Sequence, residues 1–256
     1  MTDQTRDFEL ELPLDLPREA TRRLVISLAL FAYFVIGFRV MPMLSAARAT
    51  TLRTFLDDQI PFLPWTIYFY ASFYIALVYP LFVVRCPRLF DRAALAYFAV
   101  LSLCFVCYMA FPVTAVGFRP DPSSLDERVF HEWGLKLTYA LDEPYNLFPS
   151  LHLSMALTLT LAAWKASPRM GALALPIVGG VAVAIFTIKQ HYLADGLAAL
   201  GLAGGIYYWI LRPYPTQRVA ERERSNGWRG ATSYLVFHAG ALLACYVAFR
   251  LGVKVE

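Results

Sequence analysis

The chain has 256 residues, of which 58% are hydrophobic and only 16% are charged. Soluble domains are about 45–50% apolar and about 25% charged. A soluble fold of this length lacks the interior to bury such an excess, so the composition excludes one and indicates a polytopic membrane protein. The formal net charge is +4, and the basic residues form short clusters between apolar segments, which argues against a nucleic acid partner.

Apolar segments follow one another along the chain, and a helix needs about 20 such residues to cross the hydrocarbon of a bilayer. We expect an all-α membrane bundle with six to seven transmembrane helices in a single domain, residues 23–250. The segment 172–211 is too long for one crossing and is polar near its middle, so it predicts a helical hairpin. The predicted spans are 24–43, 65–84, 93–118, 149–164, 172–188, 192–211 and 232–250.

The first predicted span follows a tail, residues 1–22, that contains six acidic residues and is expected to lie in the cytosol. Arg22-Arg23, the apolar stretch and the small residues at 45–47 also resemble a cleaved signal peptide. The long acidic leader, and Arg39 near the far end of the span, favour a retained helix instead.

Lysine and arginine are distributed unequally between the two sets of loops that seven spans create. The set that includes the N-terminal tail has 14 of these residues, whereas the set that includes 119–148 and the turn at 189–191 has 8. Because short loops rich in positive charge stay in the cytoplasm, we expect the N-terminus inside and the 119–148 loop outside. The expected location is the plasma (inner) membrane.

Ionisable residues at membrane depth are costly and mark functional sites by default. His152 opens the fourth span, and His191 and Asp195 lie four residues apart where the sixth begins, so a helix places them on one face. Arg119 closes the third span, and Lys189 precedes the sixth. The predicted topology brings all five residues to the outer membrane face.

These side chains fit phosphoryl transfer through a phosphohistidine without a metal. A histidine held by a carboxylate has a fixed tautomer and greater basicity, which suits a nucleophile. A second histidine can protonate the departing alkoxide. Cations and the backbone N–H groups at a helix start stabilise phosphoryl charge, and Pro149-Ser150 suits the start of a helix.

Other interpretations of these residues stay open. His191 and Asp195 could form only a structural hydrogen bond, and Ser150 could be only a helix cap. Together with His152, the pair could also ligate a metal. Lys189 beside the pair would repel a cation, so we expect neither a metal nor another cofactor. A proton relay in a transporter or channel is a further alternative, although the sequence has no internal repeat of the transporter kind.

At these residues the chain resembles the type 2 phosphatidic acid phosphatase (PAP2) superfamily. The second signature of that family, Pro-Ser-Gly-His, is similar to Pro-Ser-Leu-His at 149–152. The third, Ser-Arg-x5-His-x3-Asp, keeps His191 and Asp195. The motif style and the aromatic run at 64–70 look closest to the inositolphosphotransferase (inositol phosphorylceramide synthase-like) branch. The resemblance covers residues 60–211, where it implies a catalytic core.

The resemblance implies an integral membrane lipid phosphatase or phosphotransferase that acts on a lipid phosphate, a phospholipid or a sphingolipid in the bilayer. By the same resemblance, His191 is the nucleophile and Asp195 its orienting partner. His152 is the acid for the leaving group, and Ser150 holds phosphate oxygens.

The chain departs from the family pattern at two of its cation positions. The first signature, Lys-x6-Arg-Pro, keeps only Arg119-Pro120, because Pro112 stands where the lysine belongs. Residues 184–185, Ala-Ile, replace the Ser-Arg of the third signature. Lys189 is therefore expected to join Arg119 in binding the substrate phosphate. These losses fit the synthase-like branch better than ordinary lipid phosphate hydrolysis, and they leave a catalytically degenerate, lipid-binding homologue as an alternative.

Overall fold

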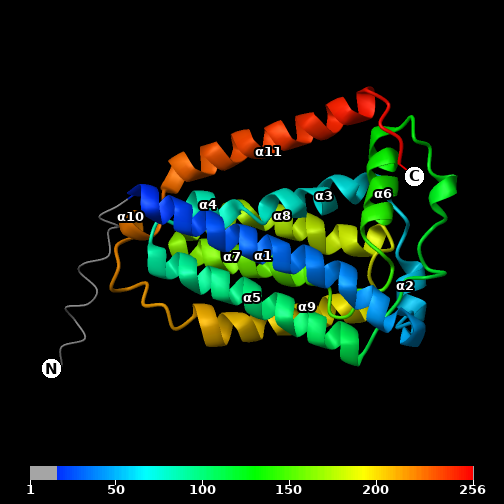
Figure 1. Ribbon diagram of the computed structural model, residues 1–256, viewed down its shortest axis with the longest axis horizontal. Helices are drawn as coiled ribbons and strands as arrows, with labels where there is room; N and C mark the ends of the chain where they lie inside the picture. Colours follow the sequence, from blue (N-terminus) through cyan, green and yellow to red (C-terminus); the bar gives the residue numbers. More distant parts are fainter. Residues whose placement is uncertain (1–15, 256) are drawn as a thin grey trace.

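The computed structural model describes residues 16–255, which form helices and turns and no strand (Figure 1). The all-α fold class is confirmed. Most of the predicted cytosolic tail lies outside the described residues, and its last part already belongs to the first helix. The helices are α1 (Leu16–Ser45), α2 (Phe55–Gln59), α3 (Ile67–Ala76), α4 (Tyr79–Val83), α5 (Pro87–Ala110), α6 (Phe130–Leu141), α7 (Leu151–Ala166), α8 (Pro168–Thr187), α9 (Leu193–Ile206), α10 (Glu221–Arg224) and α11 (Gly227–Arg250).

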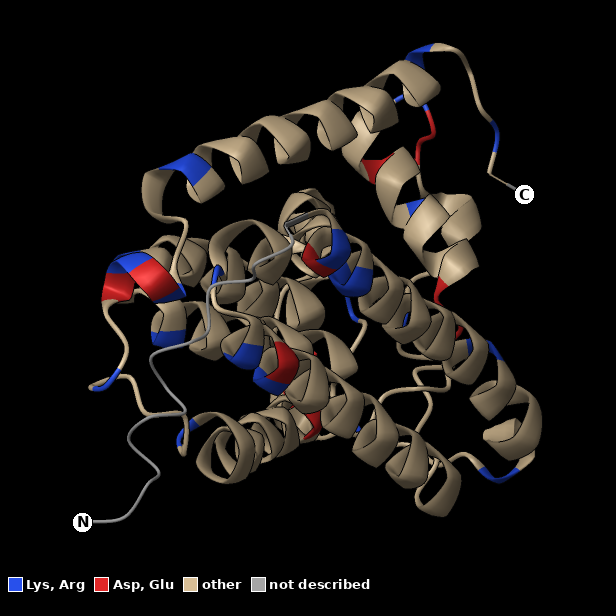
Figure 2. Cartoon of the chain, turned by 60° about the vertical axis from the view of Figure 1, so that its left-hand side comes forward, with Lys and Arg blue, Asp and Glu red and all other residues tan. Residues whose placement is uncertain are grey.

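Five of the described helices are long and apolar enough to cross a membrane: α1, α5, α8, α11, and α9 with its π-helical extension to Leu211. Each corresponds to one predicted span. Charged residues gather at helix ends and in loops, so the helix shafts are almost free of them (Figure 2). The chain is therefore an integral membrane protein, because apolar shafts of this length match the thickness of the bilayer.

The predicted fourth span is α7, which has only 16 residues. It packs against α8, α5 and α9, and most of its side chains are buried inside the protein. Ser150 caps its start, where the hydroxyl accepts a hydrogen bond from the N–H of Leu153, and an extended residue, Ser167, ends it. A helix that is buried among other helices does not need a length that matches the thickness of the bilayer.

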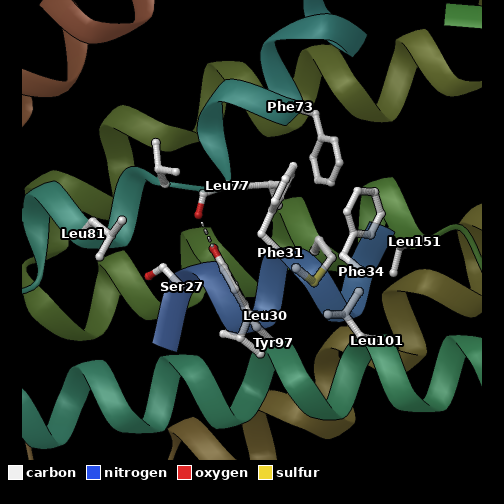
Figure 3. Close-up of a pocket in the computed structure, with 12 residues that line it drawn as sticks. Ser27, Leu30, Phe31, Phe34, Phe73, Leu77, Leu81, Tyr97, Leu101 and Leu151 are labelled. Atoms are coloured by element: carbon white, nitrogen blue, oxygen red, sulfur yellow. Dashed lines mark hydrogen bonds between the residues drawn. The ribbon is translucent and has the colours of Figure 1, made fainter. Parts of the chain in front are cut away.

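The predicted second span, 65–84, is not one helix, because Leu77 and Val78 separate α3 from α4. Pro80 follows the break and lacks the N–H that would bond to the carbonyl of Ala76, so the helical ladder cannot continue through it. An apolar cavity of about 90 Å³ opens beside the break, between α1, α3, α5 and α7, and Phe73 and Leu151 lie at one end of it (Figure 3).

The predicted end of the third span was also wrong, since α5 stops at Ala110 and residues 111–118 form an irregular loop. Pro112 cannot donate a backbone hydrogen bond, which favours a helix end there. Part of the loop packs inside the protein. Val113 and Ala115 form a small separate cluster with Leu147 and Tyr192, whereas Phe111 and Val116 are exposed.

The loops sort to two ends of the bundle as the predicted topology requires. At one end, Val113 forms backbone bridges with both Thr50 and Asn146. At the other end, Val84 pairs with Ser225. The first end, which we term the cap, gathers residues 46–64, 111–150, 188–192 and 251–255.

The cap contains two helices that the sequence did not predict, the short α2 and the longer α6, which lies in the middle of the 119–148 loop. The end of α11 holds α6 in place. The indole N–H of Trp133 donates to the carbonyl of Val253 at 2.8 Å, and the ring centroids of Phe130 and Phe249 lie 5.2 Å apart. At its other end α11 lies close to α4, where a Cβ on Gly230 would come within 2.2 Å of the Phe82 carbonyl oxygen.

Candidate active site

Two histidines meet beneath the cap, one from the first turn of α7 and one from the turn between α8 and α9. The ring centroids of His152 and His191 lie 6.0 Å apart, and each residue is only 2% exposed. The peptide N–H of Ser150 donates to the carbonyl of Asp195 at 3.1 Å, which ties the start of α7 to the start of α9. The two histidines therefore lie close together in the buried interior.

His191 is paired with the carboxylate of Asp195. The Nδ1 atom lies 3.2 Å from Oδ2 of Asp195, and the same oxygen accepts the backbone N–H of Tyr192 at 2.9 Å. An Nδ1–H that donates to the carboxylate leaves the Nε2 lone pair of His191 free, which is the state that a nucleophile requires. The second oxygen of Asp195, Oδ1, is buried without a hydrogen-bond partner among the described residues.

The turn that carries His191 is held by the segment 53–60, which contains α2. Lys189 adopts a left-handed backbone conformation with φ of 56°, and its ammonium donates to the carbonyls of Asp57 at 2.9 Å and Ile60 at 2.5 Å. The Oδ1 atom of Asp57 accepts the N–H of Leu193, the first residue of α9, at 2.7 Å. Burial lowers the pKa of Lys189, opposed by the carboxylates of Asp58 and Asp57.

Two of the three N–H donors of Lys189 therefore bond to carbonyl groups of the segment 53–60. A contact between its third donor and the substrate phosphate stays a prediction.

His152 is surrounded by aromatic residues of α3. The hydroxyl oxygen of Tyr70 lies 3.0 Å from Nε2 of His152 and 3.2 Å from Nδ1, and the hydroxyl of Tyr74 lies 3.0 Å from Nε2. The ring of Phe73 meets the imidazole edge to face, with centroids 4.8 Å apart. The aromatic run noted in the sequence, 64–70, therefore supplies one of these phenol groups, Tyr70, and the next turn of α3 supplies the other, Tyr74.

A buried carboxylate, Asp142, lies behind these groups at the end of α6. It is 3% exposed, and its Oδ2 atom accepts the hydroxyl of Tyr70 at 2.6 Å and the side-chain amide of Gln190. The same Oδ2 lies 3.9 Å from Nε2 of His152. Burial raises the pKa of Asp142, and the positive charge of Arg119 and the hydrogen bond from Tyr70 oppose that rise.

Arg119 presents free donors to the site. Its Nη1 donates to the carbonyl of Asp142 at 2.6 Å, and the guanidinium lies 5.0 Å above the ring centroid of Tyr139. Its Nε and Nη2 are buried and have no hydrogen-bond partner within residues 16–255. Unpaired buried donors are costly, so this position suits an anion that arrives with a substrate.

Ser150 is fully buried, and its hydroxyl oxygen serves as the cap of α7. The helix start beside it offers N–H groups and a positive dipole end of the kind that binds phosphate. The capping role is shown directly, and a contact of the hydroxyl with phosphate stays a prediction.

The structure brings four predicted residues, His191, Asp195, His152 and Ser150, into one cluster, and Arg119 reaches it through Asp142. Sequence analysis missed Tyr70, Tyr74 and Asp142, whose proximity to His152 depends on the fold. Within the described residues, no group of three or more His, Cys, Asp or Glu side chains is arranged to hold a metal ion.

Comparison with known proteins adds one match. The model of the PAP2 superfamily matches residues 43–209, which is more than half of the chain and includes every residue of the cluster above. No curated protein and no solved structure matches the chain. The superfamily consists in general of phosphatase-type lipid phosphoesterases with a helical membrane fold. Its match, together with the paired histidines in a membrane bundle, shows that the chain belongs to the PAP2 superfamily.

Proposed function

We propose that the protein transfers a phosphoryl group, or a phosphorylated head group, from a lipid phosphate ester to water or to an alcohol. The pairing of His191 with Asp195, with a second buried histidine whose ring centroid lies 6.0 Å from that of His191, supports this function most directly. The first histidine has one nitrogen free to attack phosphorus, and the second stands where a leaving group would depart.

The reaction proceeds in two halves. In the first, Nε2 of His191 attacks phosphorus, the bond from phosphorus to the leaving oxygen breaks, and His152 gives its proton to that oxygen. In the second, water or an alcohol attacks the phosphohistidine, returns a proton to His152 and displaces the nitrogen of His191. Hydrolysis and transfer differ only in the second nucleophile, and neither half calls for a metal ion.

The substrate phosphate is held by groups at the ends of three segments. Arg119 supplies two unpaired donors, Nε and Nη2, and the start of α7 at Ser150 supplies backbone N–H groups. Lys189 contributes positive charge and its remaining donor from the turn before His191. Because negative charge builds up on the phosphoryl oxygens in the transition state, these donors also accelerate the reaction.

The missing cations of the family favour the inositolphosphotransferase-like branch for this chain. Ala184 and Ile185, which stand at the Ser-Arg position, are fully buried, and Pro112 at the lysine position is also buried. None of the three side chains is able to donate a hydrogen bond to a phosphate. A phosphate site with fewer cationic donors and apolar surroundings fits a lipid phosphate diester as the donor and an alcohol as the acceptor.

The test is turnover by purified full-length protein in nanodiscs, with a panel of lipid phosphates, with and without diacylglycerol or ceramide as the acceptor. His191→Ala should abolish turnover. When the lipid phosphate is labelled at phosphorus, denatured wild-type protein should retain the labelled phosphoryl group and denatured His191→Ala should not. His238→Ala is the matched control, because His238 lies on α11 and contacts Tyr234 rather than the cluster. Unchanged turnover in His191→Ala would falsify the phosphohistidine mechanism, and lipid binding without turnover by wild-type protein would indicate the degenerate homologue.

A further inference from the structure

Each histidine of the cluster faces its own carboxylate, but by a different route. Asp195 bonds to His191 directly at 3.2 Å. Asp142 lies 3.9 Å from His152, beyond hydrogen-bonding distance, and the hydroxyl of Tyr70 bonds to both. Tyr70 is 0% exposed, so these bonds lie in the buried interior of the protein.

The direction of the hydrogen bonds follows from the donors that each group has. The Oδ2 atom of Asp142 already accepts from the amide of Gln190, and it accepts the only proton of the Tyr70 hydroxyl at 2.6 Å. The oxygen of Tyr70 is then left with lone pairs toward His152, so it can only accept. The ring nitrogen of His152 that bonds to Tyr70 must therefore carry its hydrogen, which fixes the position of one ring N–H.

The chain builds this link from three separate segments. Tyr70 comes from the middle of α3, Asp142 ends α6 in the cap, and Gln190 precedes His191 in the turn between α8 and α9. Gln190 thereby connects the carboxylate behind one histidine to the turn that carries the other. Arg119 fixes Asp142 from the backbone side, where it donates to the carbonyl oxygen at 2.6 Å.

We propose that Tyr70 and Asp142 are positioning residues for His152, which hold its ring through the N–H that bonds to Tyr70, so that the other ring nitrogen carries its proton toward the leaving oxygen. This inference rests on the proposed function, in which His152 is the acid. Before the step, the negative charge of Asp142 stabilises the positive charge of protonated His152. When the bond between phosphorus and the leaving oxygen breaks, His152 gives one proton to that oxygen. Tyr70 and Asp142 neither gain nor lose a proton in this step.

The dependence of the rate on the leaving group tests the inference. An alkoxide needs protonation as it departs, whereas a nitrophenolate does not. Tyr70→Phe removes one oxygen atom, so it should lower kcat about tenfold to a hundredfold for diacylglycerol phosphate in mixed micelles. For p-nitrophenyl phosphate the loss should stay below about threefold. Asp142→Asn should show the same selective loss, because the amide can no longer accept as strongly from Tyr70.

Tyr79→Phe is the matched control. Its hydroxyl is also buried and donates to a backbone carbonyl, that of Met170, at 2.9 Å, but it does not contact either histidine. It should lower neither rate by more than about twofold, since an ordinary hydrogen bond affects stability rather than the chemical step. The activity toward p-nitrophenyl phosphate also reports whether each variant has folded.

The outcomes separate the two levels of inference. Equal losses on both substrates, in Tyr70→Phe or in Asp142→Asn, indicate a structural role and overturn the positioning role, and so does the absence of any loss. If Tyr70→Phe does not fold, the ratio of the two rates in Asp142→Asn decides. Wild-type protein that turns over neither these two substrates nor any lipid of the panel, with or without an acceptor alcohol, overturns the proposed function and this inference with it, whereas an active wild type with equal losses overturns this inference alone.

Discussion

Replacement of Arg119 by methionine should separate activity from stability. Nε and Nη2 of this arginine are buried without a partner in the described residues, and only Nη1 is used, on the carbonyl of Asp142. Methionine fills a similar volume without charge or donors. Arg119→Met therefore removes two donors that act only when a phosphate is bound.

The size of the effect follows from those two donors. A hydrogen bond to a charged group contributes about 1.5–3 kcal/mol, so two of them contribute about 3–6 kcal/mol. Because about 1.4 kcal/mol corresponds to a factor of ten, kcat/KM should fall by about two to four orders of magnitude. In the empty protein, loss of the bond to Asp142 is offset by removal of two unpaired buried donors that cost about 1–3 kcal/mol each. The unfolding temperature should consequently change by less than about 5 °C.

The assay combines lipid phosphate turnover with thermal unfolding of the purified protein in detergent, with and without vanadate. Vanadate should stabilise the wild type and have little effect on Arg119→Met. Arg128→Met is the control, because Arg128 lies in the same loop but its side chain is 90% exposed and pairs with Asp126. Nearly normal kcat/KM in Arg119→Met, or a large drop in unfolding temperature that accounts for the lost activity, would refute the role of Arg119 in phosphate binding.

Two further predictions concern metal ions and sidedness. Activity should survive EDTA and be blocked by vanadate, because the cluster offers cations and histidines rather than the several oxygen ligands that Mg²⁺ prefers; loss on chelation that a divalent ion restores would favour a metal mechanism. In a variant without native cysteines, Ser123→Cys in the cap should react with an impermeant maleimide in intact cells and Ala220→Cys should not. Moving the arginine-rich loop near position 220 outward costs about 2.3 kcal/mol per charge per 100 mV, and the reverse labelling pattern would place the site in the cytosol.

Hydropathy located the helix shafts well and their ends poorly. It measures transfer from water to an apolar phase, so it treats a lipid-facing helix and a buried loop alike. Residues 111–118 were assigned to a span for that reason, although they form a loop whose Val113 and Ala115 pack inside the cap. The break at Leu77 was missed because the apolar run continues across it, and Pro80 alone signals that the helix cannot continue.

The cluster could be predicted only in part, for a related reason. His191 and Asp195 are four residues apart in the chain, so helical periodicity alone pairs them. Tyr70 and Asp142 are 72 residues apart and belong to an aromatic run and a polar loop that hold several similar residues. No spacing rule selects them. Their meeting depends on how α6 lies across the cap, which in turn depends on contacts with the last helix of the chain.

That arrangement of α6 links distant parts of the sequence to the chemistry. One end of α6 is clamped to α11 through Trp133 and Phe249, and the other end delivers Asp142 to Tyr70. Almost none of the apolar stretch of α11 is buried in the protein, so α11 contributes little to the core but acts as a brace for the cap. A truncation or a substitution near Phe249 that lowers turnover should therefore be interpreted first as a displaced Asp142, more than 100 residues away in the chain, and not as a loss of lipid contacts along α11.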